Sequence, residues 1–339
     1  MKIAVIGGFG YKYVNGQTIK AENLCELLSD QEVIKIDSAN WKRHPFRLIK
    51  NIKNAFKTCE SIIMLPAHRG VKVFSRILVH FKKKYSKKIY YDVIGGWLPD
   101  YLSKDKKLVK VLSNFDGIWV ETDTMKQKLD KLNVKNVTII QNYKNINPIN
   151  LSQLLYYKDE DTKKICTFSR VSKMKGISDV INAVKQVNKF GYKLELDIYG
   201  PIEDDYSNEF NLLVKSSDNC HYCGIIDSNK SVDVIKNYYM LCFPTRYYTE
   251  GVPGTIIDAY CAGVPVLASK WESACDIIID NTTGFLYDFC SNDELVNKLL
   301  FCMKNTEIVN SKKISVLTIA RQYTLDSCKE KVMRCLYGN

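Results

Sequence analysis

The sequence predicts an α/β protein of two doubly wound, Rossmann-like domains that face a central cleft. Three observations support this. The chain has 339 residues, whereas one domain usually has about 150. Short runs rich in Ile and Val alternate with segments of helical periodicity, as in parallel sheets covered on both faces. That alternation lapses in mid-chain and then restarts, which predicts a second sheet.

In the first half, six apolar runs predict the strands of one sheet, and the segments between them predict its helices. The runs are 2–7, 33–36, 61–65, 88–91, 117–120 and 137–140. Around Ile149–Asp161 the pattern lapses into polar residues, which indicates a linker. We therefore predict a first domain over residues 1–163.

The second half repeats this alternation and ends in helical sequence. Its predicted strands are 164–168, 194–199, 220–223, 239–243, 264–267 and 284–287. We predict a second domain over residues 164–312. The helical tail at 313–339 follows it and can return to the N-terminal domain.

Composition excludes several classes of protein. A hydrophobic share of 46% with 25% charged residues is ordinary for a globular protein and excludes disordered, collagen-like and coiled-coil chains. No run of about 18 uncharged apolar residues occurs, so no membrane-spanning helix is expected. Met1 leads directly into a buried-strand pattern rather than a signal peptide, which favours a cytoplasmic protein.

The twelve cysteines are scattered singly, as expected for reduced, buried thiols. Cys220 and Cys223 form a C-x-x-C pair, but a structural zinc site needs four ligands and no second pair follows. We expect no metal.

Charge is distributed unevenly along the chain. Residues 1–163 carry 29 Lys and Arg against 16 Asp and Glu, whereas residues 164–339 carry 20 against 21. Residues 42–88 hold 14 basic residues and one acid. Phe46, Ile49, Ile52 and Phe56 recur there at helical spacing. The segment is expected to bind an anionic partner, either a membrane surface or a nucleic acid, although its apolar residues can equally pack on the domain's own sheet.

A glycine loop follows the first predicted strand. Gly8 and Gly10 begin a dinucleotide fingerprint, but Tyr13 occupies its third glycine position and disfavours NAD. The loop continues to Gly16, where backbone N–H groups at a helix start can face an anion, with Thr18 as the cap. A plain turn and cap fits this local pattern equally well.

The loop 169–176, after the first strand of the second half, carries two cations. Arg170 and Lys175 lie where anions bind in open sheets, and cations at a helix start oppose its dipole unless an anion compensates. The alternative is a solvated helix N-terminus.

The segment 243–266 is the second candidate for chemistry. Glu250 lies on a glycine-containing loop that leads into a helix, and Asp258 lies one turn inside that helix. Carboxylates suit hydroxyl-rich ligands because each accepts several hydrogen bonds, and the loop Gly251–Gly254 can offer N–H groups to a phosphate.

These two segments, SRVSKMKG and EGVPGTIIDAYCAGVPV, resemble the family 4 retaining glycosyltransferases, which have the GT-B fold. The resemblance covers essentially the whole chain. It implies that Arg170 and Lys175 hold the diphosphate of a nucleotide sugar, that Glu250 binds sugar hydroxyls, and that Asp258 binds the ribose where the family has Glu. The predicted donor-binding residues are Gly16, Arg170, Lys175, Glu250, Gly251, Val252, Pro253, Gly254 and Asp258.

The predicted catalytic residues are Asp92 and Glu250. Asp92 ends a strand where many family members place a histidine, and it can orient an acceptor hydroxyl or stabilise positive charge on the sugar. A cap of a helix or turn is the alternative. His68 can also face the cleft, although an ordinary surface histidine is the simpler interpretation.

The resemblance implies transfer of a sugar, with retention, from a nucleoside-diphosphate sugar, without metal or cofactor. A UDP-sugar is the expected donor, with a GDP-sugar as the alternative. The first domain would bind a glycan or lipid-linked acceptor of cell-surface polysaccharide synthesis, and the enzyme would lie peripherally on the inner face of the membrane. Two alternatives remain open: a nucleotide-sugar epimerase of the same fold, and a basic nucleic-acid-binding protein, whose recognition motifs the sequence lacks.

Overall fold

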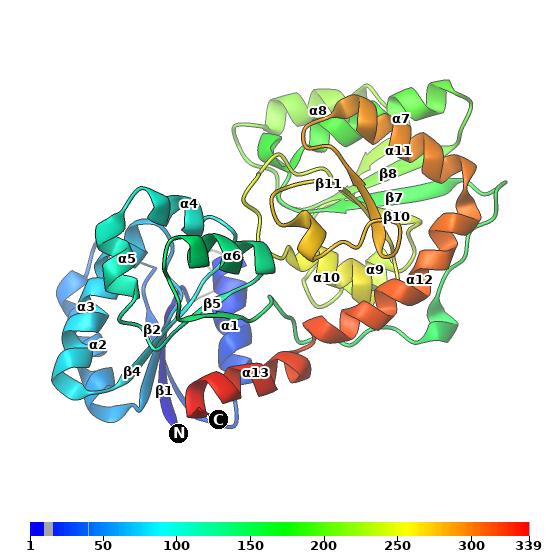
Figure 1. Ribbon diagram of the computed structural model, residues 1–339. Helices are drawn as coiled ribbons and strands as arrows, with labels where there is room; N and C mark the ends of the chain where they lie inside the picture. The colour runs from blue at the N-terminus through cyan, green and yellow to red at the C-terminus, as the bar shows by residue number, and fades with distance from the viewer. Residues whose placement is uncertain (10–15, 40, 339) are drawn as a thin grey trace. The chain divides into compact units, whose positions relative to one another are not determined.

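The computed structural model describes residues 1–9, 16–39 and 41–338, and it divides the chain into two compact units. Unit 1 consists of Met1–Asn145 and Tyr323–Asn339, and unit 2 of Ile146–Gln322. Each unit holds one six-stranded, wholly parallel sheet (Figure 1). The predicted fold class is confirmed, and each of the twelve predicted strands is present.

The sheet of unit 1 has the strand order β2-β1-β3-β4-β5-β6. Its strands are β1 (Lys2–Gly7), β2 (Glu32–Asp37), β3 (Ser61–Met64), β4 (Lys88–Asp92), β5 (Gly117–Val120) and β6 (Val137–Ile139). Its helices are α1 (Gly16–Leu27), α2 (Pro45–Thr58), α3 (Arg69–Tyr85), α4 (Leu98–Ser103), α5 (Lys106–Leu112), α6 (Asp123–Lys131) and α13 (Leu325–Tyr337).

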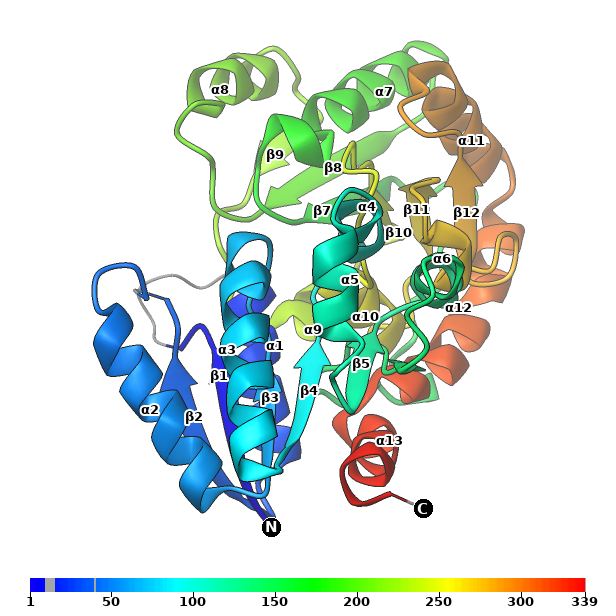
Figure 2. The ribbon, with the colours of Figure 1, turned by 60° about the vertical axis from the view of Figure 1, so that its left-hand side comes forward.

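Helices cover both faces of this sheet because alternate strand residues are apolar on both sides. On β1, Ala4 and Ile6 pack with residues of α2 and α3. Figure 2 shows these two helices on the same face of the sheet. Ile3 and Val5 of the same strand pack with residues of α1 and α13 on the opposite face. The near-continuous burial of β1 follows from this double cover.

The sheet of unit 2 has the order β12-β11-β10-β7-β8-β9. Its strands are β7 (Lys163–Phe168), β8 (Leu194–Tyr199), β9 (Cys220–Tyr222), β10 (Met240–Phe243), β11 (Val266–Ser269) and β12 (Gly284–Tyr287). Its helices are α7 (Ile177–Lys189), α8 (Ser207–Lys215), α9 (Ser231–Ile235), α10 (Gly254–Cys261), α11 (Asn292–Lys304) and α12 (Thr306–Ala320).

The boundary between the units differs from the predicted one at 163/164. Residues 146–163 belong to unit 2 because that segment is hydrogen-bonded to it. The Ile149 N–H donates to the Cys261 carbonyl at 2.8 Å, and the Tyr157 hydroxyl donates to the Asn237 carbonyl at 2.7 Å. A polar composition therefore marked a segment that lies on the surface of unit 2 rather than a free linker.

The C-terminal tail, predicted as one helical segment over 313–339 that can return to the N-terminal domain, is divided between the two units. Residues up to Gln322 stay in unit 2, and the segment from Tyr323 onward belongs to unit 1. There Cys328, Val332 and Leu336 of α13 join the core that contains Ile3 and Val5.

None of the helices in the described part of the chain is long and apolar enough to cross a membrane. All twelve cysteines are free thiols, and most are buried. Cys220 is buried and Cys223 exposed, and no group of three His, Cys, Asp or Glu among the described residues is placed to hold a metal ion.

Lys313 on α12 is a buried cation in unit 2. Its side chain is 1% exposed, and its ammonium lies 5.9 Å from the centroid of the Tyr157 ring. Burial lowers the pKa of Lys313 to about 8, because no carboxylate of the described residues forms an ion pair with it. At neutral pH, folding must therefore bury the charged Lys313 ammonium, which lowers the free energy of unfolding.

Lys313→Met should raise the free energy of unfolding by about 3 kcal/mol at pH 7. Between pH 8 and 10.5 the unfolded chain still holds the proton that the folded chain has released. Wild-type stability should therefore rise with pH in that window, and the advantage of the variant should vanish near its upper end. Urea unfolding at pH 7 and pH 10.5 measures both; the exposed Lys304→Met is the control. A pH-independent gain would contradict the assignment.

Candidate active site

The strand order of unit 2 reverses between β7 and β10, the point at which open α/β sheets bind ligands outside their carboxyl ends. The predicted loop 169–176 follows β7, and residues 244–253, the loop part of the predicted segment 243–266, follow β10. A backbone hydrogen bond joins them: the Arg246 N–H donates to the Met174 carbonyl at 2.9 Å.

Gly176 permits this close approach of the two loops. Its φ of +65° lies in the left-handed region, and a Cβ built on it would lie 1.8 Å from the Pro244 carbonyl oxygen. Only glycine fits there without moving one of the loops. The residue therefore fixes the spacing between Lys175, which precedes it, and the loop that carries Glu250.

The structure brings Lys175 and Glu250 together. The Lys175 ammonium donates to Oε1 of Glu250, and the Thr245 hydroxyl donates to the same oxygen at 3.0 Å. The Lys175 and Glu250 side chains are 19% and 14% exposed, so solvent screens the pair only partly. The Lys175 ammonium also lies 5.3 Å from the centroid of the Phe243 ring.

Arg170 lies on the same loop but is far more open. Its guanidinium donates to Oε1 of Glu203 at 3.0 Å, and its side chain is 65% exposed. An exposed ion pair of this kind contributes little to stability. Arg170 can therefore exchange Glu203 for an incoming anion at small cost.

The glycine-containing segment ends in α10. Gly251 and Val252 are buried, Pro253 is extended at the position before the helix, and Gly254 is its first residue. Asp258 lies one turn inside α10 and is only 5% exposed. The structure thus places the predicted residues 250–254 and 258 on one continuous loop and helix start.

Sequence analysis missed the ion pair of Arg246 and Asp179. Arg246 binds Asp179 through two parallel hydrogen bonds of 2.7 and 2.6 Å, and these hydrogen bonds raise the pKa of Arg246. Asp179 is an acid in the first turn of α7, where the helix dipole favours it. An acid at this position, three residues after Gly176, was the sequence feature that could have indicated a partner for a nearby cation.

In unit 1, Asp92 forms part of a buried ion cluster. It ends β4, is 1% exposed, and lies 3.0 Å from the Lys20 ammonium of α1. The same ammonium donates to Oε1 of Glu121 and to the Val93 carbonyl, both at 2.7 Å. Asp92 is therefore not the cap considered as its alternative role, and contact with a substrate stays a prediction.

Burial sets the ionisation of this cluster. It raises the pKa of the Asp92 carboxyl, although the Lys20 ammonium acts in the opposite direction. Burial alone would lower the pKa of Lys20, but the charges of Asp92 and Glu121 outweigh it and the pKa is raised. The lysine therefore stays charged, and the cluster holds two carboxyl groups for one cation.

His68 is exposed at the start of α3 and strained. Its φ is +45°, outside the usual range for a residue with a side chain, and its ring stacks on Trp97 at a centroid distance of 4.3 Å. The predicted donor loop near Gly16 continues into residues 10–15, which lie outside the described residues. Thr18 is not a cap, because α1 already begins at Gly16.

Residues 156–313 match the protein-family model described as "Glycosyl transferases group 1", which spans most of unit 2. The chain contains a group 1 glycosyltransferase domain. The matched range includes all donor-site residues predicted in unit 2, and the predicted enzyme class is confirmed.

Relatives carry related names. The chain is 24% identical over 250 residues to the uncharacterised glycosyltransferase MJ1069 of Methanocaldococcus jannaschii, which covers 69% of this chain and 58% of that protein. It is 23% identical to MJ1178 of the same organism, over 94% of this chain and 93% of the relative. It is 27% identical to the capsular polysaccharide biosynthesis glycosyltransferase CapM of Staphylococcus aureus, over 39% and 35%.

The fold is similar to that of solved GT-B glycosyltransferases. Anabaena HepE in complex with UDP has a TM-score of 0.78 at 15% identity, with both chains fully covered. The lipopolysaccharide outer core galactosyltransferase WaaB has a TM-score of 0.72 at 14% identity, over 99% of each chain.

Gly176→Ala should displace the loop of Lys175 from that of Glu250, because its Cβ meets the Pro244 carbonyl oxygen. We expect a loss of stability of at least about 1–2 kcal/mol, with weaker binding of nucleoside diphosphate. Denaturant unfolding and calorimetric titration with UDP measure the two effects.

Gly191→Ala is the matched control. Gly191 has a φ of +87° in the same unit, but a Cβ there would meet nothing within 4 Å. It should cost stability through backbone strain and leave UDP binding unchanged. Equal loss of UDP binding in both variants would contradict the role assigned to the Gly176–Pro244 approach.

Proposed function

We propose that this group 1 glycosyltransferase transfers a sugar from a nucleoside-diphosphate sugar, with UDP as the nucleotide, and with retention at the anomeric carbon. The observation that carries the proposal is the pairing of Lys175 with Glu250 at the strand reversal of unit 2. The similarity to HepE in complex with UDP, and to HepE in complex with UDP-glucose, supports the choice of nucleotide.

In the proposed reaction the bond between the anomeric carbon and the diphosphate breaks, and the acceptor hydroxyl oxygen forms the new bond and releases its proton to the departing diphosphate. Negative charge then develops on the departing diphosphate. Lys175 and Arg170 would stabilise that charge, which is an electrostatic task that needs no metal. Exchange of the Lys175–Glu250 contact for diphosphate would free the Glu250 carboxylate to accept hydrogen bonds from sugar hydroxyls.

Unit 1 would select the acceptor, which we propose to be a glycan or a lipid-linked glycan of cell-surface polysaccharide synthesis. The name of CapM supports this choice. Asp92 would act at the carboxyl edge of the unit 1 sheet, held in place by Lys20.

Arg170→Ala and Lys175→Ala should each weaken UDP binding by about 1.5–3 kcal/mol, since a charge-assisted partner of the diphosphate is lost. Calorimetric titration with UDP measures this. Lys173→Ala is the matched control, because Lys173 lies on the same loop and is likewise paired with a carboxylate, that of Glu209 at 2.9 Å, but is assigned no contact with the diphosphate. The site is wrong if UDP affinity is unchanged in the first two variants, or if the control loses as much.

Glu250→Gln should reduce turnover of a UDP-sugar more than it reduces UDP affinity, because its proposed partner is the sugar. Release of UDP from a panel of UDP-sugars measures turnover. Equal losses of turnover and of UDP affinity would instead assign Glu250 to the diphosphate end of the site.

We further propose that unit 1 docks on an anionic membrane through α2. Leu48, Ile52 and Phe56 are buried, so the apolar face of this helix packs mainly on its own domain. Phe46 is nevertheless 86% exposed and Ile49 is 38% exposed. Around them lie exposed bases that pair with no acid among the described residues: Lys42, Arg43, Arg47, Lys50, Lys53 and Lys57.

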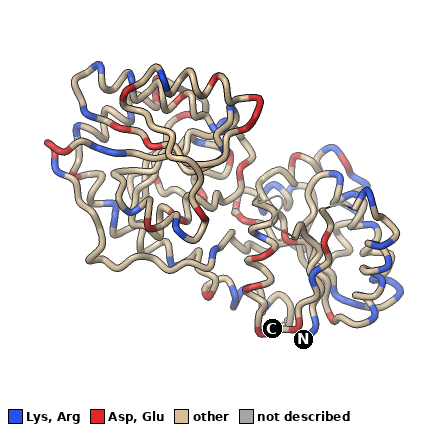
Figure 3. The backbone as a smooth tube through the Cα atoms, turned by 180° about the vertical axis from the view of Figure 1, so that it is seen from behind, with Lys and Arg blue, Asp and Glu red and all other residues tan. Residues whose placement is uncertain are grey.

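An exposed aromatic residue among cations fits an anionic lipid surface, since apolar insertion and charge attraction add. Arg47, Lys50, Lys53 and Lys57 lie on α2, and Lys42 and Arg43 come just before it. Figure 3 shows that Lys and Arg gather along the right-hand edge of unit 1. Docking there would bring a cytoplasmic enzyme to a lipid-linked acceptor as a peripheral protein.

The protein should pellet with vesicles containing anionic lipid, not with neutral vesicles, and salt should reverse the binding. Phe46→Ser with Ile49→Ser should abolish pelleting. Ile225→Ser is the control, because Ile225 is 68% exposed in unit 2 and residues 220–229 contain no lysine or arginine. A wild-type protein that stays in the supernatant with anionic vesicles at low salt would refute membrane docking.

A further inference from the structure

Unit 1 contains a second basic feature, at the opposite end of β4 from Asp92. A cavity of about 410 Å³ opens where α3 ends and β4 begins. Its lining holds four lysines and one acid: Val79, Lys82, Lys83, Ser86, Lys87, Lys88, Asn114 and Asp116. Cations therefore exceed anions in this concave site by three.

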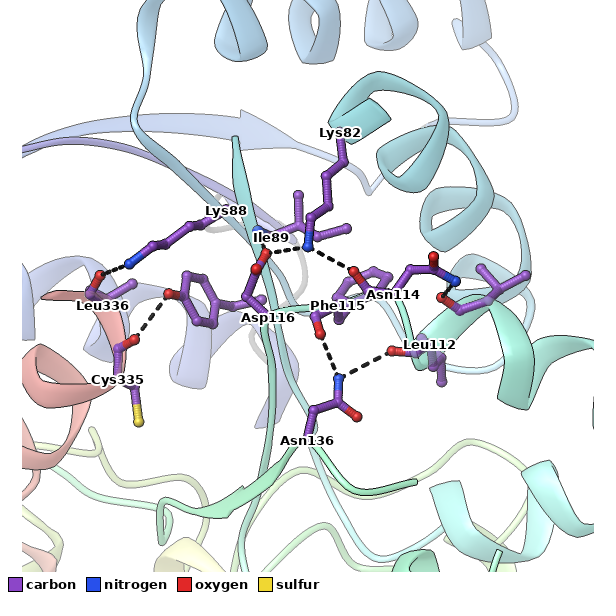
Figure 4. A network of polar contacts seen from close by, with 12 residues as sticks. Lys82, Lys88, Ile89, Leu112, Asn114, Phe115, Asp116, Asn136, Cys335 and Leu336 are labelled. Carbon is purple, nitrogen blue, oxygen red and sulfur yellow. Dashed lines mark hydrogen bonds and ion pairs between the residues drawn. The ribbon is translucent and has the colours of Figure 1, made fainter. Parts of the chain in front are cut away.

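The one acid of the cavity is already neutralised within the fold. The Lys82 ammonium donates to Oδ2 of Asp116 at 2.7 Å and to the Asn114 carbonyl at 2.8 Å (Figure 4). The Ile89 N–H donates to the same Asp116 oxygen at 2.8 Å. Asp116 thus fixes Lys82 in position and offers little repulsion to an entering anion.

The other lysines differ in how they are held. Lys88 donates to the Leu336 carbonyl at the end of α13 at 3.3 Å (Figure 4). Lys83 and Lys87 form no ion pair with any residue that the structure describes. Ser86 lies between them in the left-handed conformation that ends α3, and its side chain is exposed.

We propose that this cavity binds a phosphate group, and that a phosphomonoester dianion is its ligand. The surplus of cations in a concavity attracts a multiply charged anion, since the local field of like charges is focused there. Lysine ammonium groups bind phosphate oxygens as compact point charges, and the Ser86 hydroxyl can add a hydrogen bond. The site is independent of the proposed transfer reaction, because it lies at the amino end of β4.

Lysine footprinting with inorganic phosphate tests the site directly on the whole chain. Reductive methylation followed by mass spectrometry should show all four lysines of the cavity, Lys82, Lys83, Lys87 and Lys88, protected about ten-fold when phosphate is at about ten times its Kd. Lys106 and Lys107, exposed on α5 of the same unit, should react at an unchanged rate. Equal slowing by chloride at the same ionic strength, or equal protection of the control lysines, would overturn the proposal.

Variants distinguish phosphate binding in this cavity from binding at the proposed donor site, which also takes phosphate groups. Lys83→Gln with Lys87→Gln should abolish phosphate protection of Lys82 and Lys88 and leave UDP affinity unchanged. Lys175→Ala should weaken UDP binding and leave phosphate protection of Lys82 and Lys88 unchanged. Phosphate protection of Lys82 and Lys88 that persists in the double variant would overturn the assignment of its ligands.

Two vesicle compositions identify the source of the phosphate. Phosphatidic acid carries a phosphomonoester, whereas phosphatidylglycerol carries a phosphodiester. If the ligand is a lipid headgroup, phosphatidic acid should retain the protein more strongly at matched surface charge, and the double variant should lose that preference. If the ligand is a free phosphorylated compound, the two vesicle types should bind equally while inorganic phosphate still protects Lys83 and Lys87.

Discussion

Two loops leave the sheet of unit 2 from adjacent strands, and the candidate site depends on how closely their backbones approach. The contact of Gly176 with the Pro244 carbonyl leaves no room for a side chain. A second glycine, Gly200, meets the Ser169 carbonyl in the same way, so the loop of Arg170 is confined on its other side as well. Rigid loops hold Lys175 and Glu250 at a fixed separation, which preorganises charge for a ligand rather than requiring the ligand to order it.

Burying an ion pair removes its charges from water, which is unfavourable. The two charged clusters discussed above differ in how far they are removed from water. At the strand reversal of unit 2, Lys175 and Glu250 are partly open, so a ligand can exchange for either partner. In unit 1 the Lys20 ammonium is closed off, with Asp92, Glu121 and the Val93 carbonyl as its partners. Such a closed cluster favours one geometry of the strand ends around it. The exposure of the Lys175–Glu250 pair would allow a ligand to replace one partner, whereas the Lys20 cluster is closed to solvent.

Most of the fold was predictable because strand periodicity is a local signal. Apolar runs located all twelve strands to within two or three residues, and glycine-containing loops after strands indicated the two segments proposed to bind the donor. The contacts that give these residues their geometry are not local. Lys20 pairs with Asp92, 72 residues away in the sequence, and Lys175 with Glu250, 75 residues away. Local residue spacing therefore predicts neither ion pair.

The errors of the sequence analysis have the same origin. Polar residues around Ile149–Asp161 were interpreted as a linker because composition alone does not show that their backbone is hydrogen-bonded to unit 2. Phe46 and Phe56 share one helical pattern, yet one is exposed and the other buried, because only packing decides which end of a helix lies over the sheet.

The return of α13 to unit 1 imposes an order on synthesis. Unit 2 is a single stretch, Ile146–Gln322, so all its residues have left the ribosome before those of α13. Until Cys328, Val332 and Leu336 arrive, the face of the first sheet formed by Ile3 and Val5 lacks part of its cover. The domain that begins first is thus completed last, and the nascent chain must carry an unfinished apolar surface while more than half of the protein is translated.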